Sequence, residues 1–235
     1  MTAIWAVVPA AGSGSRFGGD IPKQYLEVAG QSLIAHALDA LLSHPRVAGA
    51  MVALGAGDTH WPGWTARRGK PVHSCIGGAD RAASVLAALQ ALAPVAGEDV
   101  LVLVHDAARP NLDTRDLDRL IDAALQDGHG ALLAAPVRDT LKRIDDDGRS
   151  AGTEPRERLW RALTPQAARL DVLREALESA RDAGTLVTDE AMALERMGRR
   201  PRMVEGRDDN IKVTTPADRA LVDHLLSSRA NRERA

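Results

Sequence analysis

A glycine-rich stretch near the start of the chain combines the residue types that bind polyphosphates. It covers residues 9–24, PAAGSGSRFGGDIPKQ, and contains the cations Arg16 and Lys23. Glycines permit positive φ and close backbone approach, so successive N–H groups can converge on an anion. A guanidinium and an ammonium would neutralise the charge of that anion. The stretch therefore predicts a loop that holds a polyphosphate.

Two better-known glycine loops fit this stretch poorly. A Walker A loop ends in Gly-Lys-Ser or Gly-Lys-Thr, and the sequence contains no such triplet. The dinucleotide fingerprint needs a third glycine where Phe17 stands, and Gly18 comes one residue later. Pro22 also pushes Ile21 towards an extended conformation, so no helix is expected directly after the loop. An ordinary turn with incidental glycines is the remaining alternative.

A second glycine turn, GGADRAAS at residues 77–84, opens an alanine-rich helix. Its two glycines allow close approach to a ligand, and Arg81 and Ser84 would lie on adjacent turns of one helix face. A tight turn followed by a helix whose first turn is favoured by Asp80 accounts for the same residues. Local evidence leaves both interpretations open.

Charged residues also follow a predicted strand in the middle of the chain and a turn near its end. Asp106 and Arg109 come directly after the apolar run at residues 100–104. Open α/β sheets bind ligands at the edge where such strands end. A simple ion pair at a turn is the alternative for these two residues. Lys212, beside the turn-forming residues 206–210, is either a second ammonium for phosphate or an exposed lysine.

Alternating apolar and amphipathic segments must position these side chains. We predict strands at residues 4–8, 48–54, 72–76, 100–104, 130–137 and 202–205. We predict helices at residues 32–42, from the second glycine turn to about 92, 113–125, 170–182, 189–197 and a last one ending near 226. Residues 55–69, with Trp61 and Trp64, are expected to be irregular and peripheral. The alternation indicates an α/β fold with a mostly parallel sheet.

The segment at residues 138–158 differs from the rest because it is polar. Leu141 and Ile144 are its only large aliphatic residues, and Asp147-Gly148 is typical of a hairpin turn. Such a segment buries too little apolar surface to fold alone, so it is either a mobile loop or a β-ribbon arm that packs on another subunit. We favour the arm. The three acids at residues 145–147 are interpreted as a solvated tip and not as a metal site.

Composition limits the classes of protein that fit. The chain has 235 residues, 45% of them apolar, which suits one domain at residues 1–228 with a disordered tail at 229–235. A formal net charge of -2 indicates neither nucleic-acid nor membrane binding. The single Cys75 cannot form an intrachain disulfide, and residues 1–8 lack the basic start of a signal peptide. We therefore expect a cytoplasmic protein.

Taken together, the motifs resemble the 2-C-methyl-D-erythritol 4-phosphate cytidylyltransferase family over nearly the whole chain. Phe17 stands where the family is expected to have methionine, and Asp80 where glutamate is usual. Ribitol-phosphate cytidylyltransferases are similar in the same blocks. The seven blocks, in order, are PAAGSGSRFGGDIPKQY, GGADRAASV, VHDAARP, APVRDTLKR, LWRALTPQ, TDEA and EGRDDNIKVTTPAD.

The resemblance implies a Rossmann-like α/β nucleotidyltransferase of the non-mevalonate isoprenoid pathway. Such an enzyme joins CTP to methylerythritol phosphate, gives 4-diphosphocytidyl-2-C-methyl-D-erythritol and releases pyrophosphate, with Mg²⁺ held mainly by the CTP phosphates. The family is also similar in forming a homodimer through the arm. Two alternatives are cytidylyl transfer to ribitol 5-phosphate and a sensor that binds CTP without turnover.

Roles for individual residues are carried over from the family. Arg16 and Lys23 would stabilise charge at the α-phosphate, and the resemblance places Arg156 and Lys212 beside them as catalytic cations. Backbone contacts to the triphosphate are expected at Ala10, Ala11, Gly12 and Gly14. The cytosine and ribose would lie by Gly78, Arg81 and Ser84.

The second substrate would occupy the region of Asp106 and Arg109, and Asp106 is the one residue implied as a metal ligand. Thr140 and Arg156, on the arm, would reach the substrate of the neighbouring subunit. Thr164 and Thr188 are expected near Lys212. A phosphate monoester is already a nucleophile at neutral pH, so the chemistry requires charge neutralisation and positioning and no histidine or cysteine base.

Overall fold

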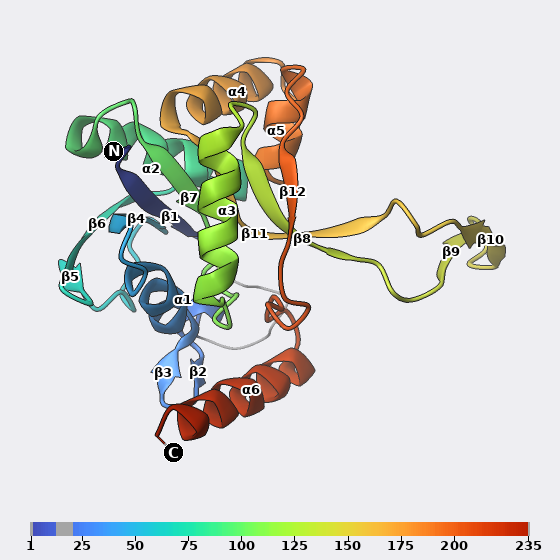
Figure 1. Cartoon of the computed structure of the whole chain (residues 1–235), viewed down its shortest axis with the longest axis horizontal. Coiled ribbons are helices and arrows are strands. Elements are labelled where there is room, and N and C mark those ends of the chain that lie inside the picture. The colour runs from blue at the N-terminus through green and yellow to red at the C-terminus, as the bar shows by residue number, and fades with distance from the viewer. Residues whose placement is uncertain (1, 13–20, 235) are drawn as a thin grey trace.

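The central sheet has eight strands and is mostly parallel (Figure 1). A computed structural model describes residues 2–12 and 21–234. The strand order is β12-β8-β11-β7-β1-β4-β6-β5, and all pairs are parallel except β11 with each neighbour and β5 with β6. The strands are β1 Ile4–Ala10, β4 Val47–Leu54, β5 Ala66–Arg67, β6 Lys70–Ile76, β7 Leu101–Val104, β8 Ala131–Pro136, β11 Trp160–Arg169 and β12 Arg202–Glu205.

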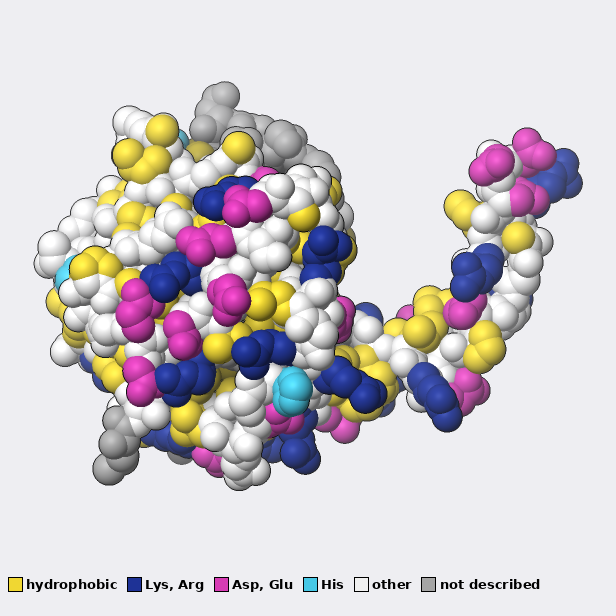
Figure 2. Space-filling view, turned by 90° about the horizontal axis from the view of Figure 1, so that it is seen from above, with side chains coloured by type: hydrophobic (Ala, Val, Ile, Leu, Met, Phe, Trp, Pro, Cys, Tyr) yellow, Lys and Arg dark blue, Asp and Glu magenta, His cyan; other side chains and the backbone are white. Residues whose placement is uncertain are grey.

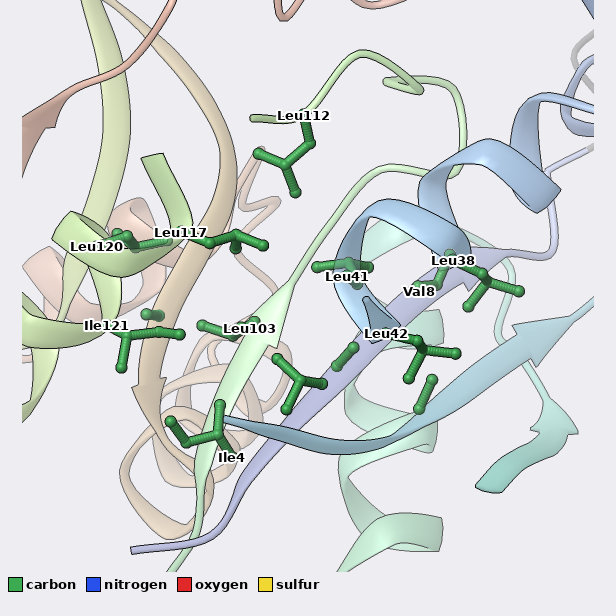
Figure 3. Close-up of a cluster of buried hydrophobic side chains, with 14 of the residues drawn as sticks. Ile4, Val8, Leu38, Leu41, Leu42, Leu103, Leu112, Leu117, Leu120 and Ile121 are labelled. Carbon is green, nitrogen blue, oxygen red and sulfur yellow. The ribbon is translucent and has the colours of Figure 1, made fainter. Parts of the chain in front are cut away.

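Helices cover both faces of this sheet because successive residues of a strand point to opposite sides. Along β1, Ile4 and Val8 pack against α1 and α3, the cluster drawn in Figure 3, whereas Trp5 and Val7 pack against α2, α4 and α5. The helices are α1 Leu33–Leu42, α2 Arg81–Ala96, α3 Thr114–Gln126, α4 Leu170–Asp182, α5 Glu190–Arg196 and α6 Pro216–Arg234. The two-sided core confirms the predicted α/β fold.

Three features of the strands differ from the prediction, and one is the short edge strand β5, which lies in a segment expected to be irregular. β11 lies between β8 and β7 and runs antiparallel to both, although no strand was predicted there. Pro165 within β11 argues against a central strand, but the register shifts between Ala162 and Gln166, which removes the proline from the regular ladder. A small hairpin of β2 Glu27–Val28 and β3 Gln31–Ser32 was also missed.

The last helix is longer than predicted. α6 continues to Arg234, so the predicted helix end near residue 226 is wrong, and residues 229–234 of the segment expected to be a disordered tail are helical. No proline or glycine interrupts SSRANRER, and its alanine, arginines and glutamate favour helix. Val222 and Leu226 pack on Val28 and Leu33, which fixes α6 against the small hairpin. In the described parts of the chain, no helix is both long and apolar enough to cross a membrane.

The polar segment forms a β-ribbon, as predicted. β9 Leu141–Ile144 pairs antiparallel with β10 Ser150–Glu154 in a separate two-stranded sheet. Gly148 takes a φ of 75° in the turn. The ribbon projects from the body beyond β8 and β11, and charged side chains gather at its tip (Figures 1 and 2). Every residue of β9 and every residue of β10 except Glu154 is exposed, so the ribbon buries little surface against the described body of its own chain.

Candidate active site

A cleft of about 290 Å³ opens at the carboxyl edge of the sheet, where β1 and β7 end. This is the edge at which open α/β sheets bind ligands. Its lining consists of residues 9–12, 78–81 and 106–108, together with Lys23, Gln24, Ser84 and Lys212. The cleft therefore gathers segments that are far apart in the sequence but were each predicted to bear site residues.

The first wall comes from β1 and the turn that carries Lys23. Ala10, Ala11 and Gly12 line the cleft, whereas the predicted residues Gly14 and Arg16 lie outside the described residues. Lys23 begins a short 3-10 helix, Lys23–Tyr25. Buried Gln24 donates through Nε2 to the carbonyl of Ala10 at 2.8 Å, and the Tyr25 hydroxyl donates to Asp58 at 2.6 Å. The first bond holds the lysine turn against the end of β1, and the second ties it to the loop after β4.

The glycine turn before α2 forms a second wall. Asp80 caps α2 by accepting a hydrogen bond from the Ala83 amide at 2.8 Å, in line with one of the two interpretations of this turn. A Cβ at Gly77 would lie 2.7 Å from the Cβ of Ala11, so this position excludes a side chain. The Ser84 hydroxyl accepts from the Gly78 amide at 3.1 Å and donates to the Asp80 carbonyl at 2.7 Å. Ser84 therefore holds the turn that faces the cleft.

Asp106 is the centre of a buried ion cluster beside the cleft. Its Oδ1 accepts from Arg81 Nε at 2.9 Å, and its Oδ2 contacts Lys212 Nζ at 2.9 Å and Arg109 Nε at 3.4 Å. Burial alone would raise the pKa of Asp106, but the charges of Arg81, Lys212 and Arg109 hold it well below its usual range. Asp106 therefore stays ionised and orients Lys212 towards the cleft.

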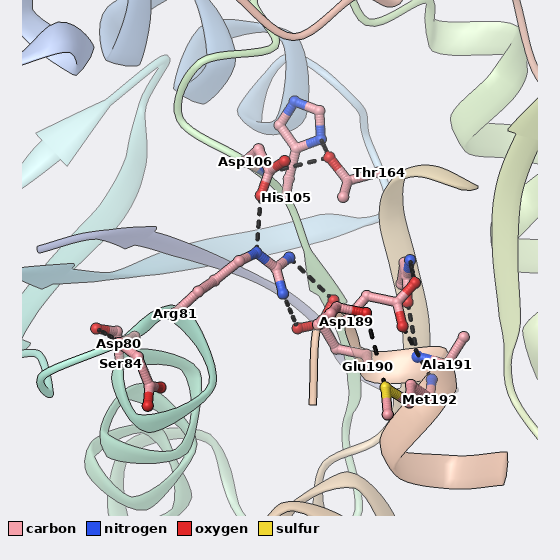
Figure 4. A network of polar contacts seen from close by, with 12 residues as sticks. Asp80, Arg81, Ser84, His105, Asp106, Thr164, Asp189, Glu190, Ala191 and Met192 are labelled. Atoms are coloured by element: carbon pink, nitrogen blue, oxygen red, sulfur yellow. Dashed lines mark hydrogen bonds and ion pairs between the residues drawn. The ribbon is translucent and has the colours of Figure 1, made fainter. Parts of the chain in front are cut away.

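Glu190 completes this cluster and was not predicted as a site residue. Its two carboxylate oxygens pair with Arg81 Nη1 at 2.6 Å and Nη2 at 3.0 Å (Figure 4). Glu190 is only 2% exposed and lies on α5. In the sequence it reads as an acidic residue in the first turn of a helix, a common stabilising position. No local signal indicated that its partner lies 109 residues earlier.

His105 is a neutral, buried histidine that supports the turn at residues 105–109, which carries Asp106 and Arg109. His105 Nε2 donates to the Arg109 carbonyl at 2.9 Å, so Nδ1 accepts from the Thr164 hydroxyl at 3.0 Å. The Thr164 oxygen in turn accepts from the Asp106 amide at 3.1 Å. Complete burial lowers the pKa of His105 to about 4. The imidazole is therefore uncharged at neutral pH, and Thr164 lies behind Asp106 instead of lining the cleft.

The remaining predicted residues lie outside the cleft. Arg109 is beside it, with Nη1 donating to the Asn210 carbonyl at 2.7 Å. Thr188 is exposed just before α5. Thr140 and Arg156 belong to the exposed ribbon, where Arg156 donates to the Arg138 carbonyl. The last two residues do not reach the cleft of their own chain.

The described residues of the cleft do not fit a metal ion held by the protein alone. Among the residues that the structure describes, no group of three or more His, Cys, Asp or Glu side chains could hold one. Both oxygens of Asp106, the predicted metal ligand, are engaged by cations. Three positive charges beside one carboxylate repel a divalent cation. The Asp106 carboxylate therefore acts as the counter-ion of the surrounding cations and not as a metal ligand.

A helix-covered parallel sheet with a cationic cleft at its carboxyl edge defines a nucleotide-binding class of α/β protein. The family model of 2-C-methyl-D-erythritol 4-phosphate cytidylyltransferase matches residues 4–228. The relative of that name from Stenotrophomonas maltophilia is 64% identical over 228 residues, covering 97% of this chain and 98% of its own. The chain therefore belongs to the 2-C-methyl-D-erythritol 4-phosphate cytidylyltransferase family, which confirms the resemblance.

Solved structures of the same family agree with the fold. The 2-C-methyl-D-erythritol 4-phosphate cytidylyltransferase from Francisella tularensis superimposes with a TM-score of 0.81 at 30% identity, covering 95% of this chain and 99% of that one. The enzyme from Thermus thermophilus gives a TM-score of 0.76 at 32% identity, covering 96% of this chain and 98% of that one. The similarity thus extends over nearly all of each chain.

Proposed function

We propose that this protein transfers a cytidylyl group from CTP to 2-C-methyl-D-erythritol 4-phosphate in the isoprenoid pathway. The observation that carries the proposal is the cleft itself, which places Lys23 and the Asp106-bound Lys212 beside a glycine-containing backbone at the end of β1. Family membership over residues 4–228 supports the choice of these two substrates.

The reaction requires positioning and charge neutralisation. An oxygen of the substrate phosphate attacks the α-phosphorus of CTP and forms a new P–O bond. The bond from that phosphorus to the bridging oxygen breaks, and pyrophosphate leaves with the electron pair. Because the attacking oxygen is already anionic, no general base is needed. The large cost is that of bringing two anions together, which fixed cations offset.

Each wall of the cleft has a proposed role. Backbone amides at Ala11 and Gly12 bind the triphosphate, with Lys23 and Arg16 neutralising the α-phosphate. The turn of Gly78 and Ser84 accommodates the nucleoside. Lys212 lies across the cleft, held by Asp106, and stabilises the pentacoordinate phosphorus. The family similarity supports these assignments, and the shared lining of one cleft is consistent with them.

We propose that the phosphate oxygens of CTP would be the main ligands of Mg²⁺, which would supply charge neutralisation there. The chain's own cations carry the remaining charge. Residues 1–228 would act as one cytoplasmic domain, and the arm at about 138–158 would form a homodimer in which Thr140 and Arg156 enter the partner's site. Support comes from the ribbon itself, which points away from its own body and exposes Leu141 and Ile144.

The test is pyrophosphate release by the purified protein with Mg²⁺ and CTP. Methylerythritol 4-phosphate is compared with ribitol 5-phosphate, and ATP, GTP or UTP replaces CTP in parallel reactions. Release only with CTP and methylerythritol phosphate is expected. Preference for ribitol phosphate would retain the chemistry and refute the proposed substrate. Binding of CTP with no release from any pair would favour the sensor.

A further inference from the structure

Glu190 is a buried carboxylate that does not line the cleft, yet it contacts the ion cluster through Arg81. We infer that Glu190 is a positioning residue for the transfer reaction, because it holds Arg81 on Asp106 and so fixes the Asp106–Lys212 pair at the cleft wall. This inference rests on the proposed function.

The orientation of Arg81 follows from its contacts. Its Nη1 and Nη2 atoms are bound by the two oxygens of Glu190, and its Nε atom points to Asp106 Oδ1. A planar guanidinium bound in this bidentate way has one fixed direction for Nε. Asp106 Oδ2 is left for Lys212 and Arg109. The rotation of the Asp106 carboxylate is thus set from both sides.

The net charge of the ion cluster shows why Glu190, its second carboxylate, matters. Burial raises the pKa of Glu190, and its bidentate pairing with Arg81 opposes that rise. With Glu190 held ionised by this pair, the three cations Arg81, Arg109 and Lys212 and the two carboxylates leave a net charge of +1. Without the charge of Glu190 the net charge would be +2. Arg81 lines the cleft, so without the pair to Glu190 its guanidinium could rotate towards an anion bound there. Glu190 therefore keeps Arg81 paired with Asp106, so that Arg81 does not leave this carboxylate to pair with the substrate.

Glu190 is itself held firmly at the start of α5. Asp189 caps the helix by accepting from the Met192 amide at 2.9 Å. Gln166, on β11, accepts from the Ala191 amide at 2.8 Å and donates to Asp189 Oδ2 at 2.9 Å. These bonds fasten the first turn of α5 to the central sheet, as Figure 4 shows. The carboxylate that orients Arg81 therefore has a rigid support.

A purely stabilising role would have a different signature. A buried ion pair is weak evidence for stability, because the cost of desolvating both charges offsets their attraction. Loss of stability alone would reduce the fraction of folded enzyme and leave kcat per folded molecule and KM unchanged. Loss of positioning would instead reduce kcat in protein that remains folded, while CTP still binds.

The experiment compares Glu190→Gln with Glu195→Gln, which changes an exposed carboxylate on the same helix. Pyrophosphate release is measured over a range of CTP concentrations, and the folded fraction is measured by thermal unfolding. For Glu190→Gln we expect kcat per folded molecule to fall about tenfold or more, with KM for CTP unchanged or lower. Glu190→Asp retains the charge and should recover part of kcat, and Glu195→Gln should match the parent chain.

The inference is overturned if folded Glu190→Gln retains kcat within about twofold of the parent. It is also overturned if every loss of rate equals the loss of folded protein. Should Glu190→Gln not fold, Arg81→Lys provides the second test, because it keeps all charges but cannot form the bidentate pair. A normal kcat in Arg81→Lys would then refute the inference. An inactive parent chain would refute the proposed function instead.

Discussion

Charged side chains of the cleft and of the arm are paired in both places, but their surroundings differ. The side chain of Asp106 is 9% exposed and that of its partner Arg81 is 25% exposed, whereas Arg143 on the arm is 70% exposed and pairs with Glu154, which is 32% exposed. Ion pairs at exposed sites contribute little, because water and salt screen them and long side chains lose entropy. The cleft is therefore organised by buried ion pairs of its own chain, whereas the exposed ion pairs of the arm contribute little to fixing it.

Removing a cation from the cleft should have the largest effect. We expect Lys23→Ala to lower turnover about a hundredfold or more, the scale of losing one preorganised charge contact in a transition state. The measurement is steady-state pyrophosphate release by folded protein. Lys70→Ala is the matched control, since Lys70 donates to the His44 carbonyl and does not line the cleft. A normal rate in folded Lys23→Ala would remove Lys23 from the mechanism.

The proposed role of the arm can be tested by mixing subunits. Arg156→Ala alone should lose about as much activity as Lys23→Ala, because it removes a cation from the partner's site. If the site is shared, a mixed dimer contains one site with both cations, so mixing the two inactive variants should restore activity. Subunit exchange is verified by native mass spectrometry. No recovery in exchanged dimers would place Arg156 outside the site.

Acid should lower the free energy of unfolding through the protonation of His105. Its pKa is about 4 in the folded protein, below the ordinary value of 6.5, so the unfolded chain binds the proton more readily. The stability that this histidine contributes is complete above pH 6.5 and is lost as the pH falls towards 4. We expect a loss of about 2 kcal/mol between about pH 7 and about pH 4.5, measured by urea unfolding. His105→Gln should flatten that slope; an equal slope in the variant would contradict the assignment.

Replacing an exposed apolar side chain of the arm should give the smallest effect. It should change the affinity of the dimer and not the stability of the monomer. Ile144 is 72% exposed, and if it packs on a second subunit, Ile144→Asp should weaken the dimer about tenfold, from roughly 1–2 kcal/mol of lost burial. The unfolding temperature measured at a concentration where both proteins are monomeric should stay unchanged. Leu125→Asp, at an exposed position of α3, is the control for sedimentation equilibrium. Equal dimer affinities in the two variants would argue against assembly through the arm.

Local patterns were sufficient to predict much of the sheet and part of the site. Apolar runs marked the buried strands, and Asp80 was one sign of the start of α2, because such preferences act over a few residues. β11 escaped prediction because Pro165 breaks its pattern, and only pairing with β7 and β8 stabilises it as a strand. Tertiary partners override local propensity in such cases.

Residue types and short spacings alone account for the α/β alternation, the polar arm and the segments that carry Lys23, Gly78, Asp106 and Lys212. How those segments meet depends on the folded arrangement of the whole chain. Arg81 and Glu190 pair across 109 positions, and Thr164 reaches the Asp106 amide from 58 positions away. Such pairs form because packing helices on both faces of one sheet brings distant segments together and excludes the water that would otherwise satisfy their charges.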